Sequence, residues 1–199
     1  MGSTFSTGPL PNKLFKYLIN LELIVVRGKI FRFERSIDRN FDDVLFISKK
    51  QLQWVLKINE KQTYILYQRF NSYNRPKLPA LEIWGAMALC SSGEVPEKVG
   101  LLFSLMDFNK NHHLSRIDME VLISVVTKGL SKFKGVNIPP MKTITRIVSA
   151  LFAYEDAIFN EYGEIYVQSV QEFMVTNDLC RTYFSSIGTQ ASTQDLSKL

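Results

Sequence analysis

The residues best suited to hold a metal ion lie within one stretch of the chain, from Asp107 to Asp118. Side chains with oxygen atoms stand at its first, third, fifth, ninth and twelfth positions, and the eighth position is the apolar Leu114. A hard cation such as Ca²⁺ takes about six to eight oxygens, and alternate residues of a tight loop point inward. The spacing therefore predicts a calcium site, with Mg²⁺ as an alternative ion. Its expected ligands are Asp107, Asn109, Asn111, the backbone carbonyl of His113, Ser115 and Asp118.

Two positions of this stretch depart from a strong calcium loop. His112 occupies the sixth position, where the backbone needs a positive φ that glycine adopts most easily. Asp118 occupies the twelfth position, where the longer glutamate reaches the ion with both oxygens. Because only two carboxylates would face the metal, we expect weak binding, or an empty loop stabilised by Asx-type hydrogen bonds.

Apolar residues recur at three- and four-residue spacing along most of the chain, which is typical of amphipathic helices. After the loop, for example, Met119, Leu122 and Val126 share one helical face. Breaks rich in Gly, Pro, Asn and Ser separate the periodic segments, and strand signals are scarce. We therefore predict an all-α fold, with helices over residues 13–26, 60–70, 80–91, 95–106, 116–129, 141–154 and 167–184.

Three further stretches fit the same twelve-residue frame, although most of their ligand positions are lost. Each keeps an apolar residue at the eighth position, which is expected to pair with the same position of a neighbouring loop. In the second loop, Tyr73, Arg75 and Pro79 replace ligands, so we expect these three loops to bind no metal. They are residues 40–51 with Ile47, 71–82 with Leu78, and 158–169 with Ile165, the last with an alternative start at Asp156.

The segment at residues 81–99, Leu-Glu-Ile-Trp-Gly-Ala-Met-Ala-Leu-Cys-Ser-Ser-Gly-Glu-Val-Pro-Glu-Lys-Val, resembles the connection between the second and third hands of the four-EF-hand calcium-sensor family. The match is nearest to the neuronal calcium sensor group and its axonemal, calaxin-type relatives, which share the long spacer before the fourth hand. The resemblance implies paired helix–loop–helix units in two lobes. The expected organisation is an N-terminal segment and helix at 1–29, an N-lobe at 30–91, a C-lobe at 92–185 and a flexible tail at 186–199.

A degenerate EF-hand pair can still present an apolar groove that holds an amphipathic helix or coiled coil of a protein partner. We expect Trp54, Tyr64, Trp84 and Met87 to line this groove. With its lost ligands, the chain resembles a structural or regulatory subunit of a ciliary axonemal assembly, such as a dynein-docking or doublet-microtubule complex. The alternative is a membrane-peripheral calcium switch, because Gly2 and Ser6 fit the N-myristoylation pattern.

Composition excludes several other classes of function. The 199 residues contain only two cysteines and no apolar run long enough to cross a bilayer, which favours a reduced, cytoplasmic compartment. No secretory leader is expected, because the chain opens on Gly, Ser and Thr. The sequence has no phosphate-cradling glycine loop, serine elbow or zinc helix, so we expect no enzyme.

The net charge of +5 includes no dense Lys/Arg cluster, so we expect no nucleic-acid partner. The bases concentrate in residues 1–35, where they favour an acidic partner or an anionic membrane.

Overall fold

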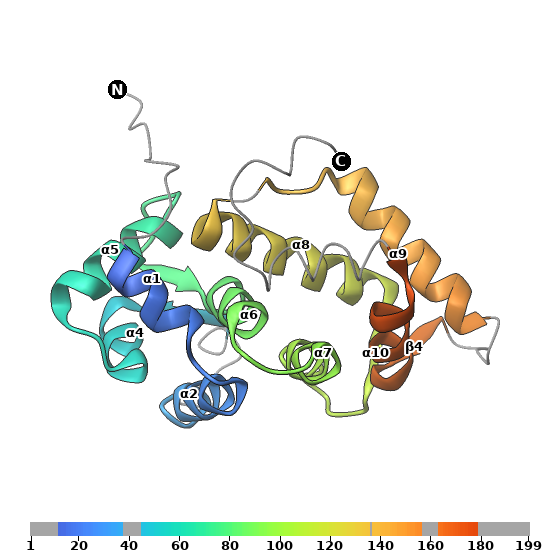
Figure 1. Cartoon of the computed structure of the whole chain (residues 1–199), viewed down its shortest axis with the longest axis horizontal. Coiled ribbons are helices and arrows are strands. Elements are labelled where there is room, and N and C mark those ends of the chain that lie inside the picture. The colour runs from blue at the N-terminus through green and yellow to red at the C-terminus, as the bar shows by residue number, and fades with distance from the viewer. Residues whose placement is uncertain (1–11, 38–44, 136, 157–162, 179–199) are drawn as a thin grey trace.

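The computed structural model describes residues 12–37, 45–135, 137–156 and 163–178, and these are mostly helical (Figure 1). The prediction of a helical fold is therefore confirmed, with two short antiparallel sheets in addition. The helices are α1 (Asn12–Ile19), α2 (Leu23–Arg35), α4 (Lys49–Leu56), α5 (Glu60–Phe70), α6 (Ala80–Cys90), α7 (Val95–Ser104), α8 (Arg116–Lys134), α9 (Met141–Asp156) and α10 (Val167–Thr176). The strands are β1 (Phe46–Ser48), β2 (Lys77–Pro79), β3 (His113–Ser115) and β4 (Glu164–Tyr166).

The two sheets join the loops in pairs, as EF-hand-like units do. In the first, β1 pairs with β2 so that Ile47 lies opposite Leu78. In the second, β3 pairs with β4 so that Leu114 lies opposite Ile165. All four side chains are buried. The predicted pairing of the eighth loop positions is confirmed in both pairs, and it sets two helix–loop–helix units side by side in each half of the chain.

The helices that follow two of the loops begin with reciprocal capping. Ser48 accepts a hydrogen bond from the backbone of Gln51, whose side chain accepts one from the backbone of Ser48. Ser115 and Asp118 make the same exchange at the start of α8. Such caps satisfy backbone N–H groups that the first helical turn leaves without partners. The ninth and twelfth loop positions therefore act here as helix caps.

Several expected helices have different bounds, and α10 ends at Thr176 instead of residue 184. The single helix predicted over 13–26 is divided into α1 and α2, because the backbone at Leu21 and Leu23 makes hydrogen bonds with Ser92 instead of continuing the helix. α8 continues five residues past the predicted end at residue 129, up to Gly135, whose φ of 77° ends it in the left-handed conformation. α2 spans residue 30, where the N-lobe is expected to begin.

The two lobes share one continuous apolar core that extends from α1 to α10. The most extensive helix contact, between α6 and α8, joins the lobes near the centre of the molecule (Figure 1). The approach is close: a Cβ at Gly129 would lie 2.0 Å from the carbonyl oxygen of Glu82, and one at Gly85 would lie 2.7 Å from a methyl group of Val126. Glycine at these two positions lets the helices touch. Within the described residues, no helix has the length and apolar character needed to span a membrane.

Candidate functional site

The third loop, residues 107–118, has the internal hydrogen bonds of a closed turn. The buried carboxylate of Asp107 accepts a bond from the backbone N–H of Asn111 at 3.1 Å and from that of His112 at 3.0 Å. The side-chain oxygen of Asn111 accepts the N–H of His113 at 3.0 Å. The loop therefore holds its shape through its own Asx-type bonds.

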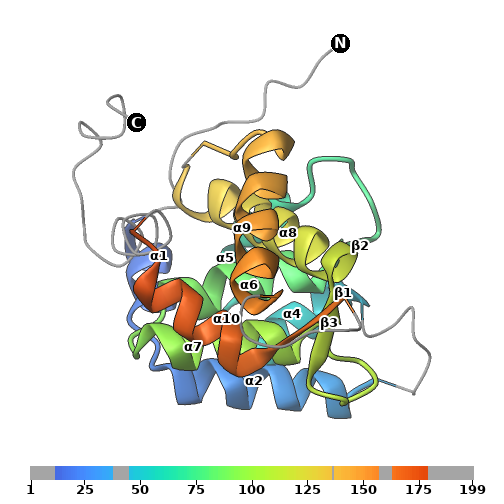
Figure 2. The same cartoon turned by 90° about the vertical axis from the view of Figure 1, so that its right-hand side faces the viewer.

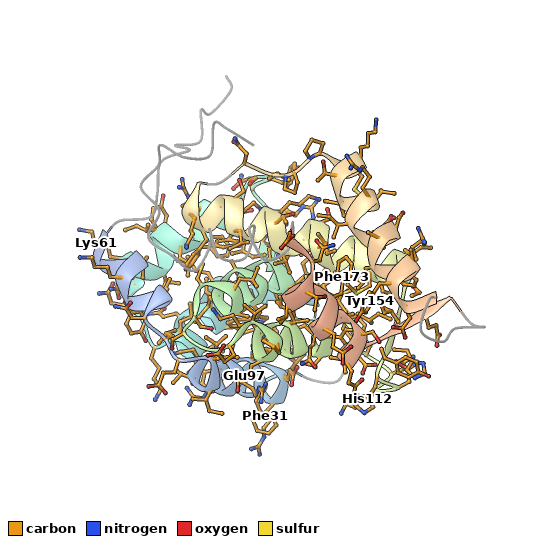
Figure 3. All side chains as sticks on the ribbon, turned by 45° about the vertical axis from the view of Figure 1, so that its right-hand side comes forward. Phe31, Lys61, Glu97, His112, Tyr154 and Phe173 are labelled. Carbon is orange, nitrogen blue, oxygen red and sulfur yellow. The ribbon has the colours of Figure 1, made fainter. Side chains whose placement is uncertain are left out.

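The backbone of this loop is left-handed at the sixth position, as expected. His112 has a φ of 64° and Lys110 has a φ of 57°. A non-glycine residue in this region carries about 1 kcal/mol of strain or more. The His112 side chain is exposed, with Nδ1 at 3.8 Å from the carboxylate of Asp107 (Figure 3). The strain at this position is the cost of keeping the loop geometry without glycine.

The twelfth position is committed to the helix cap. One carboxylate oxygen of Asp118 accepts the hydroxyl of Ser115 at 2.6 Å and the backbone N–H of Ser115 at 3.2 Å. Two of the six predicted ligands therefore bind each other. Asp107, Asn109, Asn111 and the carbonyl of His113 remain on the loop, and only the first of them is a carboxylate. This donor set does not fit a tight calcium site, which needs about six to eight oxygens including a bidentate acid.

The side chain of His113 reaches the fourth loop, which sequence reasoning missed. Its Nδ1 lies 2.8 Å from a carboxylate oxygen of Glu164, and its ring meets that of Tyr166 edge-on at 4.3 Å. The strand register explains this contact, since His113 lies directly opposite Tyr166. The predicted pairing of Leu114 with Ile165 implies this contact, because in an antiparallel pair the residue before Leu114 lies opposite the residue after Ile165.

A lysine interacts with the twelfth position of the second loop. The Glu82 carboxylate lies 2.5 Å from Nζ of Lys132, which comes from α8 in the other lobe. The same ammonium group donates to the backbone carbonyl of Phe70 at 3.1 Å, and Arg69 donates to the backbone carbonyl of Lys132 at 2.7 Å. Both side chains of the ion pair are largely buried. The acid that would close a metal site in a working loop instead joins the two lobes.

An apolar cavity of about 150 Å³ lies in the C-lobe, where α7, α8, α9 and α10 surround it with the end of α6. No charged side chain lines it. Met119 and Met174 contribute flexible thioether walls, and Thr127 turns its hydroxyl to the backbone of its own helix. The full lining is Leu89, Val99, Leu102, Phe103, Met119, Leu122, Ile123, Val126, Thr127, Pro139, Thr143, Ile147, Val170 and Met174. Cavities of this kind take up apolar groups.

The four residues expected to line a groove do not share one. Trp84 and Met87 are buried in the core on α6, whose residues are buried almost all round. Trp54 and Tyr64 are more than half exposed, and each lies against a cation: Arg32 is 5.8 Å from the Trp54 ring and Lys49 is 5.2 Å from the Tyr64 ring. The cavity in the C-lobe has a different lining. The predicted acylation site at Gly2 and the starts of the first and fourth loops, at residues 40 and 158, lie outside the described residues, whereas Asp156, the alternative start of the fourth loop, is the last residue of α9.

Within the part of the chain that the structure describes, no three histidine, cysteine, aspartate or glutamate side chains gather as a metal cluster. Comparison with known proteins gives no further assignment: no family model matches the chain, and no curated protein is significantly similar to it.

Proposed function

We propose that this chain is a non-enzymatic adaptor of the EF-hand calcium-sensor type, with at most one weak cation site. Its C-lobe cavity would receive an apolar side chain from an amphipathic helix of a protein partner. The observation that carries the proposal is the uncharged cavity between four helices. Helices that dock in grooves are held by a few apolar anchors on one face, spaced three, four or seven residues apart.

The size of the cavity supports one anchoring side chain. A dry apolar cavity of about 150 Å³ in another protein accommodates a benzene molecule. The cavity here has a similar volume, so a phenylalanine or leucine side chain fits as the anchor. Met119 and Met174 support adaptable packing around it, because methionine has three rotatable bonds and a polarisable sulfur.

The interactions in the loops support a static role instead of a calcium-driven one. Asp118, the acid that calcium would recruit at the twelfth position of the third loop, already caps α8, and Glu82 at the same position of the second loop pairs with Lys132. A change of calcium concentration would then have little to reorganise. A subunit held in a large, permanent assembly needs no such switch. We therefore extend the proposal to a structural or regulatory subunit of a ciliary axonemal complex, on the strength of the resemblance to calaxin-type proteins.

The alternative is a myristoylated membrane-peripheral calcium switch. It depends on acylation of Gly2 and on a working third loop. Intact-mass measurement of the protein from its native cell tests acylation directly: a free or acetylated N-terminus removes this alternative, and a myristoyl group supports it. Calorimetric titration with calcium tests the loop. Heat that disappears in Asp107→Ala would favour the switch over the static adaptor.

Binding of model helices tests the proposed cavity. The probes are two fluorescein-labelled amphipathic peptides with the same leucine face, one with lysine and one with glutamate on its polar face. We expect fluorescence anisotropy to report binding of at least one peptide, equally in calcium and in chelator. Ile123→Trp on α8 places a large group in the cavity lining and is expected to weaken binding by about tenfold. Ile117→Trp is the matched control, because Ile117 is 72% exposed on the same helix.

The proposal fails if neither peptide binds, or if Ile123→Trp and Ile117→Trp bind the peptide equally well. Circular dichroism and thermal unfolding of both variants must show an intact fold, so that a loss of binding reports on the cavity alone.

A further inference from the structure

α2 exposes two large apolar side chains on its outer face. Its inner face buries Leu23, Val26, Ile30 and Phe33 in the core. Its outer face presents Ile24 at 66% exposure and Phe31 at 58% exposure, seven residues apart and therefore on one line along the helix. Figure 3 shows Phe31 pointing away from the body of the protein. Apolar groups aligned on a solvent-facing helix face gain free energy when a partner or a membrane covers them.

Three arginines flank these apolar groups. Arg35 lies 5.6 Å from the Phe31 ring, and Arg32 lies 5.8 Å from the Trp54 ring on the neighbouring α4. Arg27 is exposed one turn before Phe31. Within the described residues, no carboxylate forms a salt bridge with any of the three. The helix thus carries positive charge that a negative surface would complement.

Positive charge is crowded at this corner of the molecule. Lys29, on the inner flank of α2, donates to the backbone carbonyl of Leu56 at 3.1 Å and so satisfies the end of α4. Burial lowers the pKa of Lys29 below its ordinary value, and the nearby charges of Arg32 and Lys57 lower it further. On the other flank, Glu34 is the nearest acid of the helix; burial raises its pKa, and the nearby charge of Lys110 partly offsets this.

The shape of this face is a straight ridge. In Figure 1, α2 lies at the lower edge of the molecule, and Figure 2 shows it extended along that edge with no described element below it. A single convex helix does not form a groove for another helix, but it lies flat against a planar surface. Helices with apolar groups at the apex and arginines at the sides bind in the interfacial plane of a bilayer, with the apolar face about 5–10 Å deep.

We propose that the outer face of α2, formed by Ile24, Arg27, Phe31, Arg32 and Arg35, binds the surface of an anionic membrane. The apolar side chains enter the headgroup region, and the guanidinium groups contact lipid phosphates and carboxylates. Trp54, whose exposed ring lies 5.8 Å from Arg32, adds an indole of the kind enriched at membrane interfaces. This face is separate from the C-lobe cavity, so an adaptor would hold a membrane with one surface and a helix with the other.

Vesicle sedimentation tests the membrane face with the full chain carrying Gly2→Ala, so that no acyl group contributes. The vesicles are phosphatidylcholine alone, or phosphatidylcholine with about a third phosphatidylserine. We expect binding to the anionic vesicles only, and we expect it to weaken as NaCl is raised, because salt screens the charges. Each arginine near an anionic surface contributes about 1 kcal/mol, which is about fivefold in partitioning.

Substitutions on the ridge separate charge from insertion. Arg32→Gln with Arg35→Gln is expected to lower the partition coefficient by about twenty-five-fold. Phe31→Ser is expected to lower it by about tenfold, because most of its interfacial burial is lost. Lys128→Gln on α8 is the charge control, and Ile138→Ser between α8 and α9 is the apolar control. Both side chains are exposed, and neither variant is expected to change binding.

The membrane proposal is overturned by equal binding to both vesicle types, by no binding to anionic vesicles, or by ridge variants that bind like the controls. It is also overturned if the glutamate-face peptide binds the α2 ridge but does not release the protein from anionic vesicles. The ridge would then recognise an acidic protein segment, and the vesicles would be bound elsewhere. The cavity test with Ile123→Trp and the lysine-face peptide is unaffected by any of these results, so the two proposals fail independently.

Discussion

The ion pair between Glu82 and Lys132 gives the most direct test of how the lobes are joined. Their side chains are 10% and 19% exposed, and the charged atoms lie 2.5 Å apart. Removing one partner of a buried pair costs about 3–5 kcal/mol, because the other charge stays desolvated. Because both side chains keep some exposure to water, we expect the cost for this pair at the lower end of that range. Lys132→Met should therefore lower the free energy of unfolding by about 3 kcal/mol.

The reverse change should cost less. Glu82→Gln leaves Lys132 without its acid, but the ammonium group still donates to the carbonyl of Phe70. We expect a loss of about 2 kcal/mol, which is the usual value for a hydrogen bond to a charged group. In the double variant the same interaction cannot be lost twice. Its total loss should fall short of the two single losses by about 1–2 kcal/mol.

Urea unfolding followed by circular dichroism measures all three variants, and Lys128→Met is the control. Lys128 is exposed on the same helix, so its loss should change stability by less than about 0.5 kcal/mol. Strict additivity of the single losses would refute the reasoning, because it would mean that the two charges do not stabilise each other. A loss below about 1 kcal/mol for Lys132→Met would refute it as well, since that value belongs to exposed pairs.

Three further predictions concern other parts of the structure. Gly129→Ala should destabilise the protein by about 3 kcal/mol, because its Cβ would lie 2.0 Å from a backbone oxygen of α6. Gly28→Ala should stabilise the protein by about 0.5–1 kcal/mol, because no atom lies within 4 Å of the added Cβ. Thermal unfolding of the two variants measures both effects. Burial raises the pKa of the Cys90 thiol from 9.0 to about 11. In a variant whose other cysteine is serine, alkylation near pH 8 should therefore be about a hundredfold slower in the folded protein than in urea. The stability that this pKa shift contributes should be fully present below pH 9.0 and should decline as the pH rises toward 11. A rate equal to that in urea would contradict burial of the thiol. Asp118→Glu combined with His112→Gly should bind calcium at least about tenfold more tightly than the unchanged chain in a calorimetric titration. The double variant supplies a longer acid and removes the backbone strain at position 112, where φ is 64°. An unchanged binding heat would mean that the helix cap, and not the length of the acid, limits calcium binding.

The repeated frame of the loops could be predicted because its signals are local. An apolar residue at the eighth position, as in Ile47 and Leu114, is recognised from a dozen neighbouring residues, and the strand pairs follow from it. The positive φ at His112 is of the same kind, since the loop geometry requires it whatever residue stands there. These features depend on spacing within a segment, which the sequence displays directly.

The contacts between lobes could not be predicted in the same way. Glu82 and Lys132 are fifty residues apart, and nothing near either residue marks the other. The groove residues were misjudged for a related reason. α6 is buried almost all round, so its periodicity does not tell Trp84 from a groove residue. Trp54, by contrast, stands out of phase with its buried neighbours Leu52 and Val55, and that signal predicts the exposure the structure shows.

The connection between α6 and α7 has a consequence for how the molecule meets other molecules. The backbone of Ser92 is hydrogen-bonded to Leu21 and Leu23 at the start of α2, so the junction between the lobes is clamped from the front of the chain. These two bonds oppose a bend at the junction that would close the two halves around a target. With the junction fixed, a ligand must adapt its shape to the protein. Association should then lose little protein entropy, and a partner's own flexibility should set most of the difference in affinity between one sequence and another.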